Sequence, residues 1–122
     1  MVKSYVKFQT PKDISDKLLQ LVEMAKNSGK LRKGLNESTK AIERSIAQLV
    51  IVAEDVEPEE IVMHIPQLCD EKNIPYAFVP SKLELGRAAG IEVGSAAISI
   101  TDAGEGKDLL KEVLKRLKEI GK

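Results

Sequence analysis

Apolar residues recur with the three- and four-residue spacing of an amphipathic helix near both ends of the chain. The first such stretch predicts a helix with Thr10 as N-cap and Pro11 at its first position, ending at Gly29. The second predicts a helix that follows the Gly104-Glu105-Gly106 turn. The apolar positions are Ile14, Leu18, Leu21, Val22 and Ala25 in the first helix and Leu109, Leu110, Val113, Leu114, Leu117 and Ile120 in the second.

Uninterrupted apolar runs between these helices predict strands. Residues 48–53 and 95–101 lack a polar alternation, which is typical of strands covered on both faces. Residues 75–80 form a shorter strand bounded by prolines, and residues 30–35 form an edge strand. Further helices are expected from Asn36, from Pro58 to His64, from Pro66 to Asn73, and from Lys82 to Ala89 after a Ser81 cap.

This alternation of helices and strands predicts the α/β class, as a three-layer α/β/α sandwich with a central mixed sheet. At 122 residues the chain has the usual size of one domain. We therefore expect a single domain over residues 1–122.

The stretch from Gly34 to Arg44 combines a turn, a helix cap and an amphipathic helix. Asn36 is a favourable N-cap residue, and an acid at Glu37 suits the positive end of the helix dipole. At about 100° per residue, Ile42, Ile46 and Leu49 gather on one side, whereas Glu37, Lys40 and Arg44 lie nearly opposite. One side would enter a core, and the other would present an acid and two bases beside an amide.

Composition narrows the class of protein. Hydrophobic residues make up 43% of the chain and charged residues 31%, which is ordinary for a globular protein and argues against disorder. No apolar run approaches the roughly 20 residues of a membrane span, and no signal-peptide pattern is visible, so we expect a cytoplasmic protein without a membrane partner. Two Tyr, two Phe and no Trp leave few platforms for stacking many bases.

The formal net charge of zero argues weakly against a polyanionic partner, but the charges are unevenly placed. Residues 45–71 contain seven acids and neither Lys nor Arg. The preceding stretch holds two acids, Glu37 and Glu43, and six basic residues: Lys26, Lys30, Arg32, Lys33, Lys40 and Arg44. Only the basic part would face phosphates.

No catalytic constellation emerges. Gly106-Lys107 lacks the spacing of a phosphate-binding loop and fits a strand-to-helix turn better. His64 and Cys69 could form a base and nucleophile, but no orienting group is evident, so a packed histidine and a buried thiol are favoured. We expect no enzyme activity, no metal and no cofactor. The Ile91-Glu92-Val93 loop could tuck inward or form an exposed apolar ledge, and its residues alone leave both open.

Two separated motifs carry a resemblance to a known family. Gly34-x-Asn36-Glu37-x-Thr39-Lys40-x-x-x-Arg44 and the later stretch from Gly86 to Val93 resemble the ribosomal protein L-seven-Ae family of kink-turn RNA binders, in particular its archaeal large-subunit branch. The resemblance covers nearly the whole chain.

What the resemblance implies can be stated residue by residue. Asn36, Glu37 and Lys40 would contact the guanines of tandem sheared G·A pairs, because a carboxylate accepts from a guanine edge and an ammonium donates to O6 or N7. Basic side chains would approach the RNA backbone, and the 91–93 loop, now expected to be exposed, would cover an extruded bulge nucleotide. The implied RNA-binding residues are Lys33, Gly34, Asn36, Glu37, Lys40, Arg44, Lys82, Ala89, Ile91, Glu92 and Val93.

The partners implied by the resemblance are kink-turn RNAs. They comprise ribosomal RNA of the large subunit, box C/D and H/ACA guide RNAs and ribonuclease P RNA, together with ribosomal and guide-particle proteins. We expect a free monomer. The alternative is a protein-interaction scaffold that uses the 91–93 ledge and the acidic surface from Glu54 to Glu60.

Overall fold

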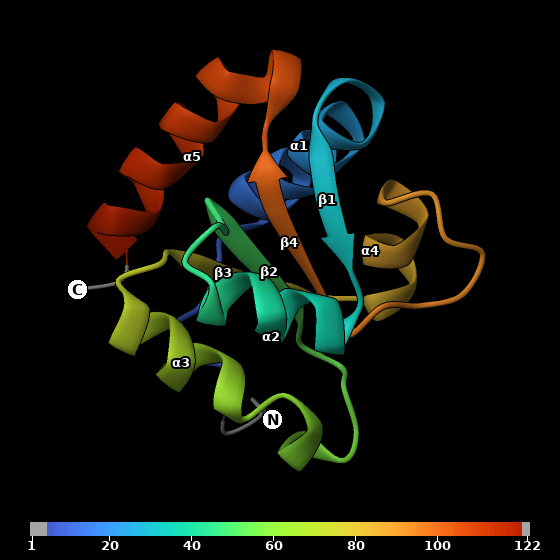
Figure 1. Ribbon diagram of the computed structural model, residues 1–122, viewed down its shortest axis with the longest axis vertical. Helices are drawn as coiled ribbons and strands as arrows, with labels where there is room; N and C mark the ends of the chain where they lie inside the picture. Colours follow the sequence, from blue (N-terminus) through green and yellow to red (C-terminus); the bar gives the residue numbers. More distant parts are fainter. Residues whose placement is uncertain (1–4, 121–122) are drawn as a thin grey trace.

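Helices and strands alternate throughout residues 5–120, the part of the chain that the computed structural model describes (Figure 1). The ends of the predicted domain, residues 1–4 and 121–122, lie outside it. The elements are α1 (Lys12–Ser28), β1 (Lys30–Lys33), α2 (Leu35–Glu43), β2 (Leu49–Ala53), the 3₁₀ turn η1 (Glu59–Ile61), α3 (His64–Lys72), β3 (Tyr76–Val79), α4 (Lys82–Ala88), β4 (Ala97–Asp102), the 3₁₀ turn η2 (Gly104–Gly106) and α5 (Lys107–Ile120).

One mixed sheet forms the middle of the molecule, with the strand order β1-β4-β2-β3. β4 pairs antiparallel with both β1 and β2, and β2 pairs parallel with β3. Every residue of β2 is buried, as its continuous apolar run predicts, and β1 is an edge strand, also as predicted. β4 begins at Ala97, two residues later than the expected strand.

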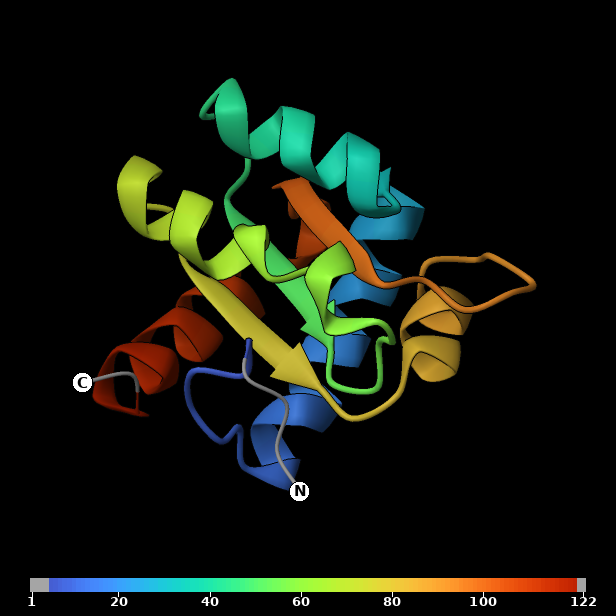
Figure 2. The ribbon, with the colours of Figure 1, turned by 90° about the horizontal axis from the view of Figure 1, so that it is seen from below.

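Helices cover both faces of the sheet. α2 and α3 pack on one face, while α1, α4 and α5 lie on the other (Figure 2). This arrangement confirms the predicted α/β/α sandwich with a mixed sheet.

α1 begins one residue later than predicted. Pro11 is its N-cap residue, with an extended ψ of 151°, and the Pro11 carbonyl accepts the Ser15 N–H at 2.9 Å to close the first turn. Thr10 is therefore not the cap, and its Oγ1 is buried without a hydrogen-bond partner among the described residues. Gly29 ends the helix as expected.

Pro66 does not interrupt a helix, so the prediction of a break at this residue is wrong. α3 starts at His64 and continues through Pro66 to Lys72. Pro66 is the third residue of the helix, where a backbone N–H has no carbonyl partner within the helix, so the proline removes no intrahelical bond. The separate piece predicted after Pro58 is the short turn η1.

An aromatic cluster closes the core beside β3. The Phe78 side chain is fully buried, and its ring centroid lies 5.2 Å from Phe8, 5.8 Å from Tyr76 and 6.3 Å from Tyr5. Tyr5 is buried too; its hydroxyl donates to the Ala53 carbonyl at 2.7 Å and accepts the Val56 N–H at 3.2 Å. These contacts fasten the segment before α1 to the end of β2.

Candidate nucleic-acid interface

A glycine links the edge strand to α2. Gly34 has φ of +92°, a backbone conformation that residues with a side chain rarely adopt. Its N–H donates to the Ala97 carbonyl of β4 at 3.0 Å. Its own carbonyl accepts the Ser38 N–H at 3.0 Å, so the helix begins immediately. No atom lies within 4 Å of the place where a side chain at residue 34 would begin, which leaves room for close approach.

Asn36 is not the N-cap of α2, contrary to the sequence prediction. Gly34 takes that position, and no side chain caps the helix. Because the positive φ of Gly34 starts the helix two residues early, Asn36 lies inside the first turn and is exposed. Its amide is thus left available to a ligand.

Glu37 lies between two cations. Its Oε1 is 3.7 Å from Arg32 Nη1 on β1, and its Oε2 is 3.5 Å from Lys40 Nζ one turn further along α2. All three side chains are about half exposed, so each pair is worth only about 0.2 to 1 kcal/mol. Such weak pairs orient the carboxylate yet can be exchanged for contacts to another molecule.

Arg32 is absent from the residues that the motif singles out. The alternation of side chains along β1 could have identified Arg32. Because Leu31 packs against the core, Arg32 must point to the opposite face of the strand, where α2 lies. Lys33, by the same alternation, points away from Arg32 and is exposed at the end of the strand.

The far end of α2 departs from the helical projection. The helix ends at Glu43, and Ser45 has φ of +57°, so Ile46 is not on the core side but 41% exposed. Arg44 is the C-cap residue and is exposed, one helical turn beyond Lys40. Ser38 is buried, and its Oγ has no hydrogen-bond partner among the described residues.

The loop after α4 presents the second set of candidate residues. Val93 is 67% exposed and Glu92 is exposed, whereas Ile91 is half buried and packs against the core. Ala89 is fully buried, so only its backbone could reach a ligand. The loop is therefore a partial ledge: its outer part is exposed and its inner part is an anchor.

The two sets of residues meet at one end of the sheet. The 91–96 loop leads into β4, whose Ala97 bonds to Gly34 and whose Ile98 is opposite Lys33, so the loop enters beside the start of α2 (Figures 1 and 2). Lys82 lies against Gly94 at the end of the loop, where an added Cβ would be 3.0 Å from Lys82 Cγ. Arg44 alone lies at the distant end of α2.

Lys26 is a further cation that the motifs do not mark. Its side chain reaches from α1 to Gly90, where an added Cβ would lie 3.0 Å from Lys26 Cδ and 3.7 Å from Nζ. No local pattern places this residue at the loop, since the approach depends on how α1 packs on α4.

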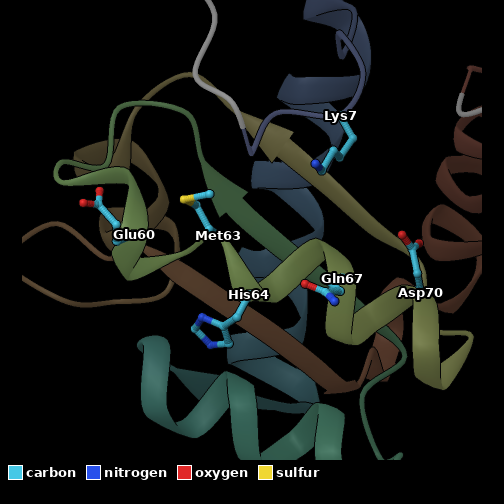
Figure 3. A pocket seen from close by; sticks show the side chains of 6 residues that line it. All are labelled: Lys7, Glu60, Met63, His64, Gln67 and Asp70. Atoms are coloured by element: carbon cyan, nitrogen blue, oxygen red, sulfur yellow. The ribbon is translucent and has the colours of Figure 1, made fainter.

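His64 and Cys69 do not act together. His64 is exposed, rather than packed as expected, and its Nε2 lies 3.0 Å from Thr39 Oγ1 of α2. The pocket beside α3, lined by Lys7, Glu60, Met63, His64, Gln67 and Asp70, is shown in Figure 3, with Glu60 and Asp70 at opposite ends and His64 turned towards α2. Cys69 is absent from this lining and is fully buried, as predicted.

We expect Cys69 to resist labelling in the folded protein. Burial, together with the smaller effect of the neighbouring Asp70 carboxylate, raises the pKa of its thiol from an ordinary 9.0 to about 12. At pH 8 a disulfide reagent should therefore react about a thousandfold more slowly with the native protein than with the urea-unfolded chain. A Cys69→Ser/Val93→Cys variant is the exposed control, and equally fast labelling of Cys69 in the folded and unfolded protein would contradict the expectation.

The Cys69 thiol should also make the free energy of unfolding depend on pH. Because its pKa is higher in the folded state than in the unfolded state, this free energy should fall as pH rises from 9.0 towards 12.

Other chemical signals in the sequence have structural uses. Gly106 is buried in η2, where an added Cβ would lie 2.8 Å from Leu21 Cδ1, so it serves a tight turn. Asp55 Oδ1 accepts the Lys82 N–H at 2.9 Å at the start of α4.

Within residues 5–120, no group of three or more His, Cys, Asp or Glu side chains is placed to hold a metal ion. None of the helices in that part of the chain has the length and apolar character to cross a membrane.

Comparison with known proteins places this geometry in a family. The model of the ribosomal protein L7Ae/L30e/S12e/Gadd45 family matches residues 16–110. A solved structure, described as the Giardia lamblia 15.5kD RNA binding protein, superposes with a TM-score of 0.90 at 31% sequence identity, over 97% of this chain and 98% of that one. With a match that spans both α2 and α4 and most of the chain, this protein belongs to the ribosomal protein L7Ae/L30e/S12e/Gadd45 family.

Proposed function

We propose that this chain is a non-catalytic RNA-binding protein whose ligand is a kink-turn, held by the start of α2 and the 91–93 loop. The observation that carries the proposal is the Glu37 carboxylate, held between Arg32 and Lys40, together with the exposed Val93 of the loop that enters beside the start of α2. Family membership and the similarity to an RNA-binding protein support RNA as the ligand.

The exposed groups suit the edges of sheared G·A pairs. The Glu37 carboxylate accepts from the N1 and N2 donors of guanine, and Lys40 donates to O6 or N7 of a neighbouring guanine. Asn36 offers both a donor and an acceptor from the first turn of α2. Each good base contact contributes about 1 to 3 kcal/mol of discrimination.

The remaining candidate residues surround these base readers. Val93 would pack against an extruded base, since single-stranded bases are commonly bound by their faces. Lys33, Lys82 and Arg44 would contact phosphates, which position the RNA but do not read its sequence.

In the cell we propose that the protein resides in the cytoplasm as a component of the large ribosomal subunit. The same surface would also serve kink-turns in box C/D and H/ACA guide RNAs and in ribonuclease P RNA. One RNA-binding domain over residues 1–122, monomeric when free, would be sufficient. The assignment to the archaeal branch stays a prediction from the sequence resemblance.

Titration of a kink-turn RNA against the same RNA with its G·A pairs replaced tests the function. We expect at least tenfold weaker binding to the replaced RNA, equivalent to about 1.4 kcal/mol. With three phosphate-contacting side chains, the logarithm of affinity should fall with a slope of about 3 against the logarithm of salt concentration. Equal affinity for the two RNAs would refute kink-turn recognition, and the salt slope would then report non-specific binding.

A second candidate function is a protein-binding scaffold. The observation that favours it is a pair of exposed apolar residues beside the acidic 54–60 stretch: Ile61, the last residue of η1, is 39% exposed, and Met63, just before α3, is 47% exposed. Nuclease treatment separates the two functions: a partner held by this face remains bound after RNA is removed, whereas loss of every partner would leave RNA as the sole ligand.

A further inference from the structure

The loop that carries Ile91, Glu92 and Val93 folds back along α4. The chain turns at Gly90, which has φ of +82°, and Ile91 N–H then donates to the Gly86 carbonyl at 2.8 Å. At the other end of the loop, Ser95 N–H donates to the Lys82 carbonyl at 2.9 Å. The loop is thus tied to α4 at both of its ends.

Between these two ties the backbone of the loop lies directly on Gly86. A Cβ added to Gly86 would be 2.2 Å from the Val93 carbonyl oxygen and 3.2 Å from Gly94 Cα. Carbon and oxygen atoms in ordinary contact are at least about 3.3 Å apart, so any side chain at residue 86 would displace the loop by about 1 Å. The obstructing atoms belong to the backbone, which cannot rotate aside as a side chain would.

The conformation of α4 does not itself require this glycine. Gly86 is absent from the residues with positive φ, and it lies inside a helix, where alanine is the more favourable residue. Helix stability would therefore favour alanine, and the close approach of the loop is the reason that the structure offers for glycine.

We propose that Gly86 is a positioning residue for RNA binding. Because it has no side chain, the loop can lie close against α4, and this closeness sets the position of Val93 relative to the RNA. Val93 is 67% exposed although its own carbonyl is packed against α4, so the ledge is ordered before a ligand arrives. A loop held ready in this way loses little conformational entropy on binding. The inference rests on the proposed function, because it assigns to Gly86 the placement of one part of that site.

Gly86→Ala tests the inference with two RNAs, a kink-turn and the same kink-turn made abasic at its extruded nucleotide. We expect the variant to bind the intact RNA roughly tenfold more weakly than the unchanged protein does, because the apolar contact to that base is lost. Binding to the abasic RNA should be the same for both proteins. Amide hydrogen exchange at Ile91 and Ser95 should be faster in the variant.

Gly106→Ala is the matched control, since a methyl group there meets the side chains of Leu21 and Met24 far from the loop. It should leave both affinities unchanged. If Gly86→Ala fails to fold, Ser95→Pro removes the N–H that donates to the Lys82 carbonyl, without adding atoms at residue 86. Ser95→Pro should give the same selective loss for the intact RNA.

Unchanged affinity of a folded Gly86→Ala protein for the intact kink-turn would overturn the inference, as would an equal loss for the abasic RNA. The unchanged protein provides the separation from the proposed function. If it fails to prefer the kink-turn over the RNA with replaced G·A pairs, the proposed function fails; if it keeps that preference while Gly86→Ala has no effect, only the positioning role fails.

Discussion

Glu37→Ala should weaken binding to a kink-turn RNA by about 5- to 150-fold, which corresponds to the roughly 1 to 3 kcal/mol of one good base contact. The carboxylate lies between Arg32 and Lys40, and the guanine N1 and N2 groups that it would meet are both donors. Removing it leaves those donors unpaired in the complex. Binding to an RNA with replaced G·A pairs should change little, so the preference itself should collapse.

Two further variants distinguish a lost contact from a changed charge. Glu43→Ala removes the same charge from the exposed last residue of α2, and it should keep or slightly strengthen RNA binding. Glu37→Gln keeps one acceptor but adds an amide donor against the donors of guanine, so it should be nearly as weak as Glu37→Ala. An equal response of Glu37→Ala and Glu43→Ala, measured by fluorescence titration, would contradict the role assigned to Glu37.

Phe78→Ala should lower the free energy of unfolding by about 3 to 5 kcal/mol. The Phe78 side chain is fully buried on β3, and its ring lies against Phe8, Tyr76 and Tyr5. Truncation therefore leaves a cavity and removes three aromatic contacts at once. The variant should still discriminate between the two RNAs at a temperature where it is folded, because the cluster is remote from α2.

Urea unfolding followed by circular dichroism measures the loss. Val93→Ala is the control for this experiment: a residue that is 67% exposed should change the unfolding free energy by no more than about 0.5 kcal/mol. A loss below about 1 kcal/mol for Phe78→Ala would mean that the cluster packs less closely than its ring separations indicate.

The layers of the fold follow from the sequence because burial on both faces leaves a plain pattern. The apolar run within residues 48–53 predicted a central strand, and the structure buries all of it from Leu49 to Ala53. The charged segment that became β1 predicted an edge. Rules based on local sequence predicted the ends of the helices less well, because capping side chains, backbone conformation and strand pairing all influence where a helix begins or ends.

Asn36 illustrates that competition. Its side chain is well suited to a cap, but the pairing of β1 with β4 and the positive φ of Gly34 begin the helix earlier. Ile46 was misplaced for a related reason, since the helical projection continued beyond Glu43, where the helix ends. In both cases the deciding interaction involves the backbone and not the side chain that carries the local signal.

The sequence identified the candidate residues that belong to a motif. It did not identify the residues that tertiary packing brings next to them. Arg32 meets Glu37 across two elements, and Lys26 reaches Gly90 from a helix that precedes the motif. The closeness of Val93 to Gly86 likewise depends on the path of a loop in three dimensions. No spacing rule along the chain encodes these approaches.

The pairing of β1 with β4 has a consequence for how the protein is made. Lys33 lies opposite Ile98 and Lys30 opposite Asp102, so the strand that leads into α2 finds its partner only about 70 residues later in the chain. During synthesis, which proceeds from the N-terminus, α2 can form early, but the loop and the sheet that place it are completed only when β4 emerges. A nascent chain therefore cannot assemble the whole of the proposed RNA-binding surface before its last strand is made.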